Sequence, residues 1–182
     1  WGWHRYPNTS AFKFKETYKS YDFHERTIDY HVQWSEPEQK RMAANYFRQN
    51  PHRLHLGIIG FELVHADGRP VMPQDITEIN QKLDMWSGTI HSQFKIDDTP
   101  VKVTTCCHQE LDLIASEIKS PLIQNGQIKI IFRFPYPSGE HVGTGCDWSV
   151  PEKHNSSLAL NETGFAKIAR RIDETTYELA IG

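Results

Sequence analysis

Apolar and polar residues alternate along much of the second half of the chain. Val101 and Val103 alternate with polar neighbours, and after the Asn125-Gly126 turn the alternation resumes at Ile128, Ile130, Phe132 and Phe134. A two-residue period places apolar side chains on one face of a β-strand. An earlier apolar stretch, residues 54–63, is ended by the hairpin turn signal Asp67-Gly68. Strands about every 8–12 residues with turns between them predict a mainly β chain folded as an antiparallel β-sandwich.

Three further stretches complete this pattern. In residues 74–87, Ile76, Ile79 and Leu83 are spaced to suit either one face of a helical turn or a long loop. Residues 135–157 are rich in Pro, Gly, Ser and Asn, which predicts a long loop. Apolar alternation then returns, and residues 165–181 predict a closing hairpin.

One short helix is predicted near residues 36–49. Ser35 and Glu38 have the spacing of a capping box, and Pro37 falls in the first turn, where its missing N–H costs little. Pro51 ends the segment because it disfavours helical backbone at the preceding residue. We therefore divide the chain into an aromatic-rich extension with this helix, residues 1–49, and a β-sandwich domain, residues 50–182.

Composition and charge exclude several classes of function. The chain has 182 residues, 38% of them hydrophobic and 24% charged, as expected for a globular domain. Lys and Arg total 20 against 23 Asp and Glu, the net charge is −3, and no long basic run occurs. Nucleic-acid binding needs a concentrated positive face, so we do not expect it. No apolar run approaches the ~20 residues that span a bilayer, so no membrane span is predicted.

No catalytic or metal-binding motif is found. The sequence lacks a nucleophile elbow, a phosphate-binding glycine loop and an HExxH motif. His52 and His55 would point to opposite faces of a strand, and a zinc site needs three or four ligands. Glycoside hydrolysis needs paired carboxylates, whereas the acids here are scattered over turns and caps. We therefore predict no catalytic residue, no metal and no cofactor in this chain.

The three cysteines, Cys106, Cys107 and Cys146, are an odd number, which argues against a disulfide framework. We expect them to be buried, apolar thiols.

Aromatic residues beside polar ones indicate carbohydrate contact. Sugar rings pack their apolar faces on aromatic planes, while their hydroxyls need polar partners. The alternative is that these tryptophans anchor the extension onto the sandwich, and that the polar segment at 52–55 is only the solvent-facing start of a strand. The residues that we expect at a ligand site or a domain interface are Trp3, His4, His52, Arg53, Asp147 and Trp148.

The stretch from residue 83 to residue 120 resembles a known family. It contains LDMWSGTI (83–90), SQFKIDD (92–98) and VKVTT (101–105), followed by His108, LDLIA (111–115) and Ser120. A similar stretch occurs in the N-terminal β-super-sandwich of glycoside hydrolases and phosphorylases whose catalytic domain is an (α/α)6 barrel. These include maltose phosphorylase-like enzymes and α-fucosidase-like and rhamnosidase-like relatives. The segment NPHRLHLGIIG (50–60) resembles their opening strand, although Asn-Pro-His replaces the usual Gly-Asn-Gly.

The resemblance implies a galactose mutarotase-like super-sandwich that packs on a helical barrel downstream in the same parent chain. It also implies that the general acid lies in that barrel and that the sandwich can line the sugar site. We therefore expect this chain to be a part of a longer, periplasmic or extracellular glycoside hydrolase, inactive alone. Two alternatives stay open: a free-standing carbohydrate-binding module with sugar affinity of its own, and a structural or adhesive β-domain with exposed apolar surface for a protein partner.

Overall fold

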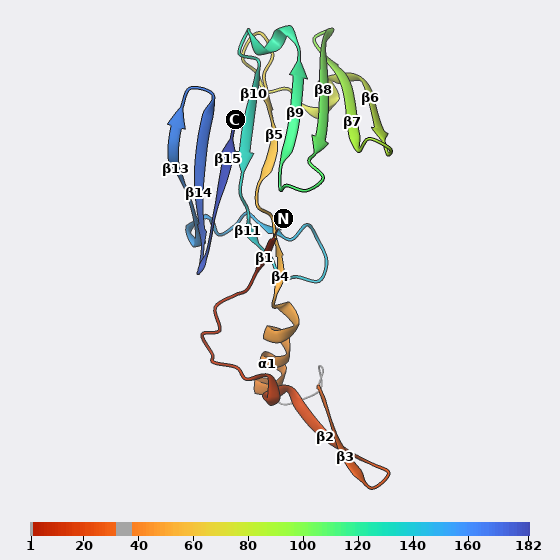
Figure 1. Ribbon diagram of the computed structural model, residues 1–182, viewed down its shortest axis with the longest axis vertical. Helices are drawn as coiled ribbons and strands as arrows, with labels where there is room; N and C mark the ends of the chain where they lie inside the picture. The colour runs from red at the N-terminus through yellow and green to blue at the C-terminus, as the bar shows by residue number, and fades with distance from the viewer. Residues whose placement is uncertain (1, 32–37) are drawn as a thin grey trace. The chain divides into compact units, whose positions relative to one another are not determined.

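The computed structural model describes residues 2–31 and 38–182. Within them the protein is mainly β, with antiparallel sheets and one α-helix, α1 (Glu38–Gln49), which confirms the predicted sandwich-like fold class and the helix (Figure 1). The predicted caps of this helix at Ser35 and Pro37 lie outside the described residues. No helix of the described residues is long and apolar enough to cross a membrane.

The chain forms two compact units. Unit 1 comprises Trp1–Ile58 and Arg133–Gly182, and unit 2 comprises Ile59–Phe132. The N-terminal extension thus shares a unit with the last strands of the chain.

Unit 2 contains a four-stranded antiparallel sheet, β6 (Ile76–Asp84), β7 (Thr89–Ile96), β8 (Thr99–Cys107) and β9 (Ile114–Lys119), in sequence order. A second pair joins β5 (Ile58–Leu63) to β10 (Ile128–Arg133). The side chains of Ile96, Val101, Leu122 and Ile128 form the buried core, and Phe61 and Leu63 of β5 pack on it. Two layers of strands therefore enclose one aliphatic core, as in a sandwich.

Both predictions for residues 74–87, a helical turn and a long loop, are wrong. After a 3-10 turn, η2 (Pro73–Asp75), they form strand β6. The pairing of β6 with β7 shifts register between Thr77 and Asn80, and Glu78 has a φ of 48°. Such a bulge adds one residue to the strand. The extra residue changed the apolar spacing along the strand and made it resemble a helical face.

Unit 1 is built from short strand pairs and one larger sheet. Strand β1 (Gly2–His4) pairs with β4 (His52–Leu54), and β11 (Tyr136–Pro137) pairs with β12 (Cys146–Asp147) inside the predicted long loop. After the turn η4 (Pro151–Lys153), the chain forms a three-stranded sheet: β13 (His154–Glu162), β14 (Phe165–Ile172) and β15 (Thr175–Ile181). The closing hairpin is β14–β15, and β13 extends it.

The N-terminal segment also holds η1 (Phe14–Thr17) and the hairpin β2 (Tyr18–Phe23) and β3 (Arg26–His31). Helix α1 packs on η1: the rings of Phe14 and Phe47 meet edge to face at 5.2 Å. Ala43 is fully buried. Aromatic contacts therefore hold this arm to the helix.

The cysteines differ from expectation. Cys106 and Cys107 are exposed and Cys146 is half-buried, so the prediction of buried thiols is wrong. Cys106 and Cys107 end strand β8, at the opposite end from the buried Val101. The hydrophobic core lies at the other end of the strand.

Candidate ligand-binding site in unit 1

Strand pairing in unit 1 brings together four of the residues singled out in the sequence. In the β1–β4 pair, Trp3 lies opposite Arg53 and His4 lies opposite His52. In the β11–β12 pair, Asp147 lies opposite Tyr136. Neighbouring residues on a strand point to opposite sides, so one side of β1–β4 carries the Trp–Arg pair and the other the two histidines.

The two histidines lie in the core instead of at a solvent-facing rim. His4 is 2% exposed and His52 is 8% exposed. The Nδ1 atom of His52 lies 2.8 Å from the carbonyl oxygen of Gln49, which can only accept, so His52 donates through Nδ1. Its Nε2 then accepts from Nδ1 of His4 at 3.0 Å. The backbone thus fixes which nitrogen of each neutral ring carries the proton.

The network continues to an aspartate that the sequence analysis missed. Asp173, in the β14–β15 turn, accepts a 2.7 Å hydrogen bond from the Tyr136 hydroxyl. Its Oδ2 also lies 3.1 Å from Nε2 of His4, without the alignment of a hydrogen bond. An unprotonated Nε2 would place its lone pair against the carboxylate, so Asp173 favours the protonated form of His4. The polar core thus joins β1, β4, β11 and the β14–β15 turn.

Burial sets the protonation of this network. Burial, followed by the nearby ring of His52, lowers the pKa of His4, and Asp173 opposes only part of that shift. Burial also lowers the pKa of His52. Burial and then Asp173 raise the pKa of Tyr136, which keeps its hydroxyl protonated as a donor.

The two tryptophans face solvent. Trp3 is 65% exposed and Trp148 is 54% exposed. The guanidinium of Arg133 lies 5.8 Å from the centre of the Trp148 ring, a cation–π distance. The indole of Trp148 therefore presents an apolar face to solvent, and the Arg133 guanidinium beside it can donate hydrogen bonds.

The carboxylate of Asp147 forms hydrogen bonds within its own turn. Its Oδ1 accepts hydrogen bonds from the backbone N–H of Ser149 at 2.9 Å and from the Ser149 hydroxyl at 2.6 Å. These bonds lower the pKa of Asp147. The carboxylate therefore shapes the turn that presents Trp148.

Arg170 is a second polar core residue that the sequence did not reveal. It is 2% exposed, donates to Ser156 at 2.6 Å and to Nδ1 of His154 at 3.0 Å, and stacks 4.7 Å from the centre of the Phe134 ring. Among the described residues it forms no ion pair with a carboxylate, and its Nε has no hydrogen-bond partner. Burial and then Arg170 lower the pKa of His154.

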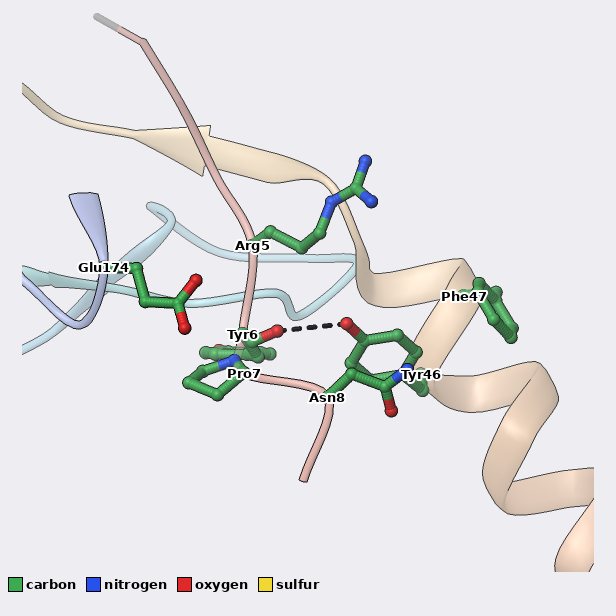
Figure 2. Close-up of a pocket in the computed structure, with 7 residues that line it drawn as sticks. All are labelled: Arg5, Tyr6, Pro7, Asn8, Tyr46, Phe47 and Glu174. Atoms are coloured by element: carbon green, nitrogen blue, oxygen red, sulfur yellow. Dashed lines mark hydrogen bonds between the residues drawn. The ribbon is translucent and has the colours of Figure 1, made fainter. Parts of the chain in front are cut away.

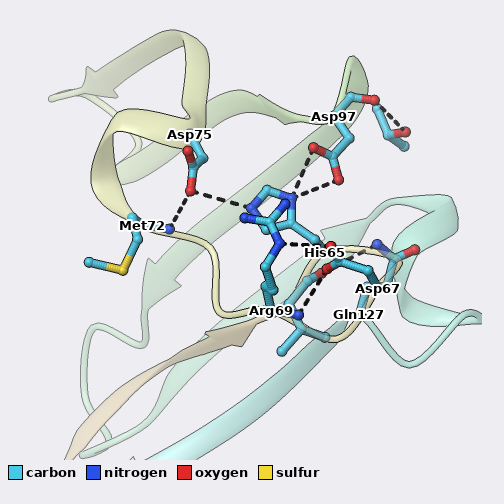
Figure 3. Close-up of polar contacts among 9 residues, drawn as sticks. His65, Asp67, Arg69, Met72, Asp75, Asp97 and Gln127 are labelled. Atoms are coloured by element: carbon cyan, nitrogen blue, oxygen red, sulfur yellow. Dashed lines mark hydrogen bonds and ion pairs between the residues drawn. The ribbon is translucent and has the colours of Figure 1, made fainter.

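Unit 2 holds a separate charged cluster around His65 (Figure 3). Nδ1 of His65 lies 2.9 Å from both carboxylate oxygens of Asp97, and Nε2 lies 3.3 Å from Oδ2 of Asp75. A ring with a carboxylate at each nitrogen is an imidazolium, and Asp97, then Asp75, raise the pKa of His65. Because both nitrogens are engaged, the cluster ties η2 and the β7–β8 turn to the loop after β5.

Two features of the described residues bear on metal binding and acid catalysis. No group of three or more His, Cys, Asp or Glu side chains among them could hold a metal ion. A glycosidase general acid needs a raised pKa. Hydrogen bonds from nearby N–H and hydroxyl groups instead lower the pKa of Asp67, Asp75, Asp84 and Asp147.

Comparison of the chain with protein-family models, with curated proteins and with solved structures gave no match.

Proposed function

We propose that this chain is a non-catalytic sandwich domain of a carbohydrate-active enzyme that contacts sugar through unit 1. The observation that carries the proposal is the solvent exposure of Trp3 and Trp148, each placed beside an arginine: Arg53 across the strand pair and Arg133 over the ring. Pyranose rings stack on such indoles, and guanidinium groups donate to their hydroxyls.

The sequence resemblance supports the same proposal. It runs from the last two residues of β6 through β7 and β8 to the end of β9, and these strands belong to one sheet of the sandwich-like unit 2. The proposal places the general acid outside this chain, in a downstream (α/α)6 barrel, and Asp147 beside Trp148, whose pKa is lowered by its hydrogen bonds to Ser149, is not proposed to act as one. We extend the proposal to a periplasmic or extracellular parent glycoside hydrolase.

A protein-binding β-domain is the second candidate. On the four-stranded sheet of unit 2, Leu83 is 54% exposed and Ile114 is 58% exposed, and Trp86 in the β6–β7 turn is 99% exposed. Exposed apolar surface of this extent often marks a contact with another protein.

Sugar titration of tryptophan variants tests the two candidates. Oligosaccharides should quench the tryptophan fluorescence of the chain, and the titration gives their affinity. Trp148→Ala should weaken that affinity about tenfold, because about 1.4 kcal/mol of stacking is lost. The melting temperature should hardly change, because Trp148 is more than half exposed. Trp86→Ala in unit 2 is the matched control and should leave sugar affinity unchanged. Loss of affinity in Trp86→Ala but not in Trp148→Ala would contradict the proposal.

A further inference from the structure

A cavity in unit 1 lies beside the polar core, and neither of the two exposed tryptophans lines it. Its volume is about 300 Å³, at the small end of ligand pockets. Arg5, Tyr6 and Pro7 line it from the segment after β1, and Tyr46 and Phe47 line it from α1. Figure 2 shows Glu174 approaching from the side opposite the helix, with its carboxylate directed toward Tyr6.

The floor of this cavity is held rigidly. The backbone N–H of Tyr6 donates to Asn50 Oδ1 at 2.7 Å, and the Tyr46 hydroxyl donates to the carbonyl of Tyr6 at 3.1 Å. The Tyr6 hydroxyl accepts from the N–H of Gly139 at 2.9 Å and lies 3.3 Å from the carbonyl of Pro137. Four hydrogen bonds thus fix one lining residue, so the cavity is formed before any ligand arrives.

Two charged side chains at the cavity are not used by the fold. Arg5 and Glu174 are both exposed, and neither takes part in a hydrogen bond or ion pair with another described residue. Arg5 provides only donors and Glu174 only acceptors. Their opposite charges balance, so the cavity favours a neutral ligand that both donates and accepts hydrogen bonds.

We propose that this cavity binds a single pyranose ring of a neutral saccharide. The ring hydroxyls donate to Glu174 and accept from Arg5, while Pro7 and Tyr46 offer apolar surface to the C–H face of the sugar. The ligand class rests on the proposed function, whereas the location rests on the cavity itself.

Backbone amide NMR titration of the chain with methyl pyranosides tests the proposal. Chemical shifts should change at residues 5–8, 46–47 and 174. Arg5→Gln and Glu174→Gln should each weaken this binding about tenfold, the effect of losing one hydrogen bond to a charged group. Glu162→Gln, which changes another exposed acid of unit 1, is the matched control and should leave the affinity unchanged. Trp148→Ala should also leave it unchanged.

The other outcomes separate this inference from the proposed function. Shift changes confined to the surroundings of Trp3 and Trp148 would overturn the cavity site and leave the proposed function standing. Changes at residues 5–8 and 174 with glycine or glutamine, but none with pyranosides, would show that Arg5 and Glu174 hold a zwitterion and would overturn the ligand class. No change anywhere with any pyranoside or oligosaccharide would overturn both.

Discussion

The two units of this protein have cores of different chemistry. In unit 2 the hydrophobic core cluster is aliphatic, formed by Ile96, Val101, Leu122 and Ile128, and the buried His65 is paired with Asp97 and Asp75 beside it. In unit 1 the hydrophobic residues Leu54 and Ile172 share the interior with His4, His52, Tyr136 and Arg170. Apolar burial stabilises in proportion to area and without direction, whereas buried polar groups stabilise only when each finds its partner. Unit 1 should therefore depend on hydrogen-bond geometry and protonation, and unit 2 on packing.

The largest expected loss of stability comes from a substitution that opens a cavity in the core of unit 2. Ile96 is fully buried, and Ile96→Ala should lower the free energy of unfolding by about 2–5 kcal/mol, because the lost contacts are only partly recovered by relaxation. The loss should be the same at acidic and neutral pH. Urea denaturation followed by circular dichroism measures it. Ile79→Ala, at a position 69% exposed, is the control and should cost at most about 0.5 kcal/mol.

A smaller loss is expected from one hydroxyl in unit 1. Tyr136→Phe keeps the ring but removes the donor to Asp173, and it should cost about 1–3 kcal/mol because the carboxylate loses a buried partner. Tyr30→Phe, at a position 59% exposed, should be nearly neutral in the same urea experiment. A cost for Tyr136→Phe as small as that of Tyr30→Phe would mean that ring packing alone orders the core of unit 1.

The same contrast explains what could be predicted from the sequence. Alternation around Val101 and Val103 predicts strand β8 because a local period of two reflects a sheet with one buried face. The alternation failed at β6, where the bulge at Glu78 changes the period. Local patterns therefore describe unit 2 well, apart from its irregular strand.

In unit 1 the decisive contacts join distant positions. His4 contacts His52, which lies 48 residues away, and Tyr136 contacts Asp173, which lies 37 residues away. Composition drew attention to Trp3, His4, His52 and Arg53, and the structure places them in one strand pair. No local signal marked Asp173 or Arg170, because an acid in a turn and an arginine in a strand look like ordinary surface residues until their neighbours are known.

The smallest predicted effect is the pH dependence of stability, which should have opposite signs in the two units. In unit 1 the folded state lowers the pKa of His4, His52 and His154 below 6.5, so the unfolded chain binds more protons and stability falls as pH drops below that value. In unit 2 the folded state raises the pKa of His65, so its contribution is full below 6.5 and is lost as pH rises through the raised pKa.

Hydrogen exchange read by mass spectrometry resolves the two units. Between about pH 5.5 and about pH 8.5, and after correction for intrinsic exchange rates, protection should rise in β4 and β14 and fall in β7 and β8. The lowered aspartate pKa values do not interfere, since these groups titrate below this range.

Two histidine variants test the cause of the response in unit 2. His65→Gln should flatten the pH response of unit 2 alone, whereas His91→Gln, at an exposed position on β7, should leave that response unchanged. If β7 and β8 lost protection at high pH even in His65→Gln, then the clamp of Asp75 and Asp97 on His65 would not be its cause. If both units responded with the same sign, the opposite pKa shifts of His65 and of the unit 1 histidines would not govern their pH dependence.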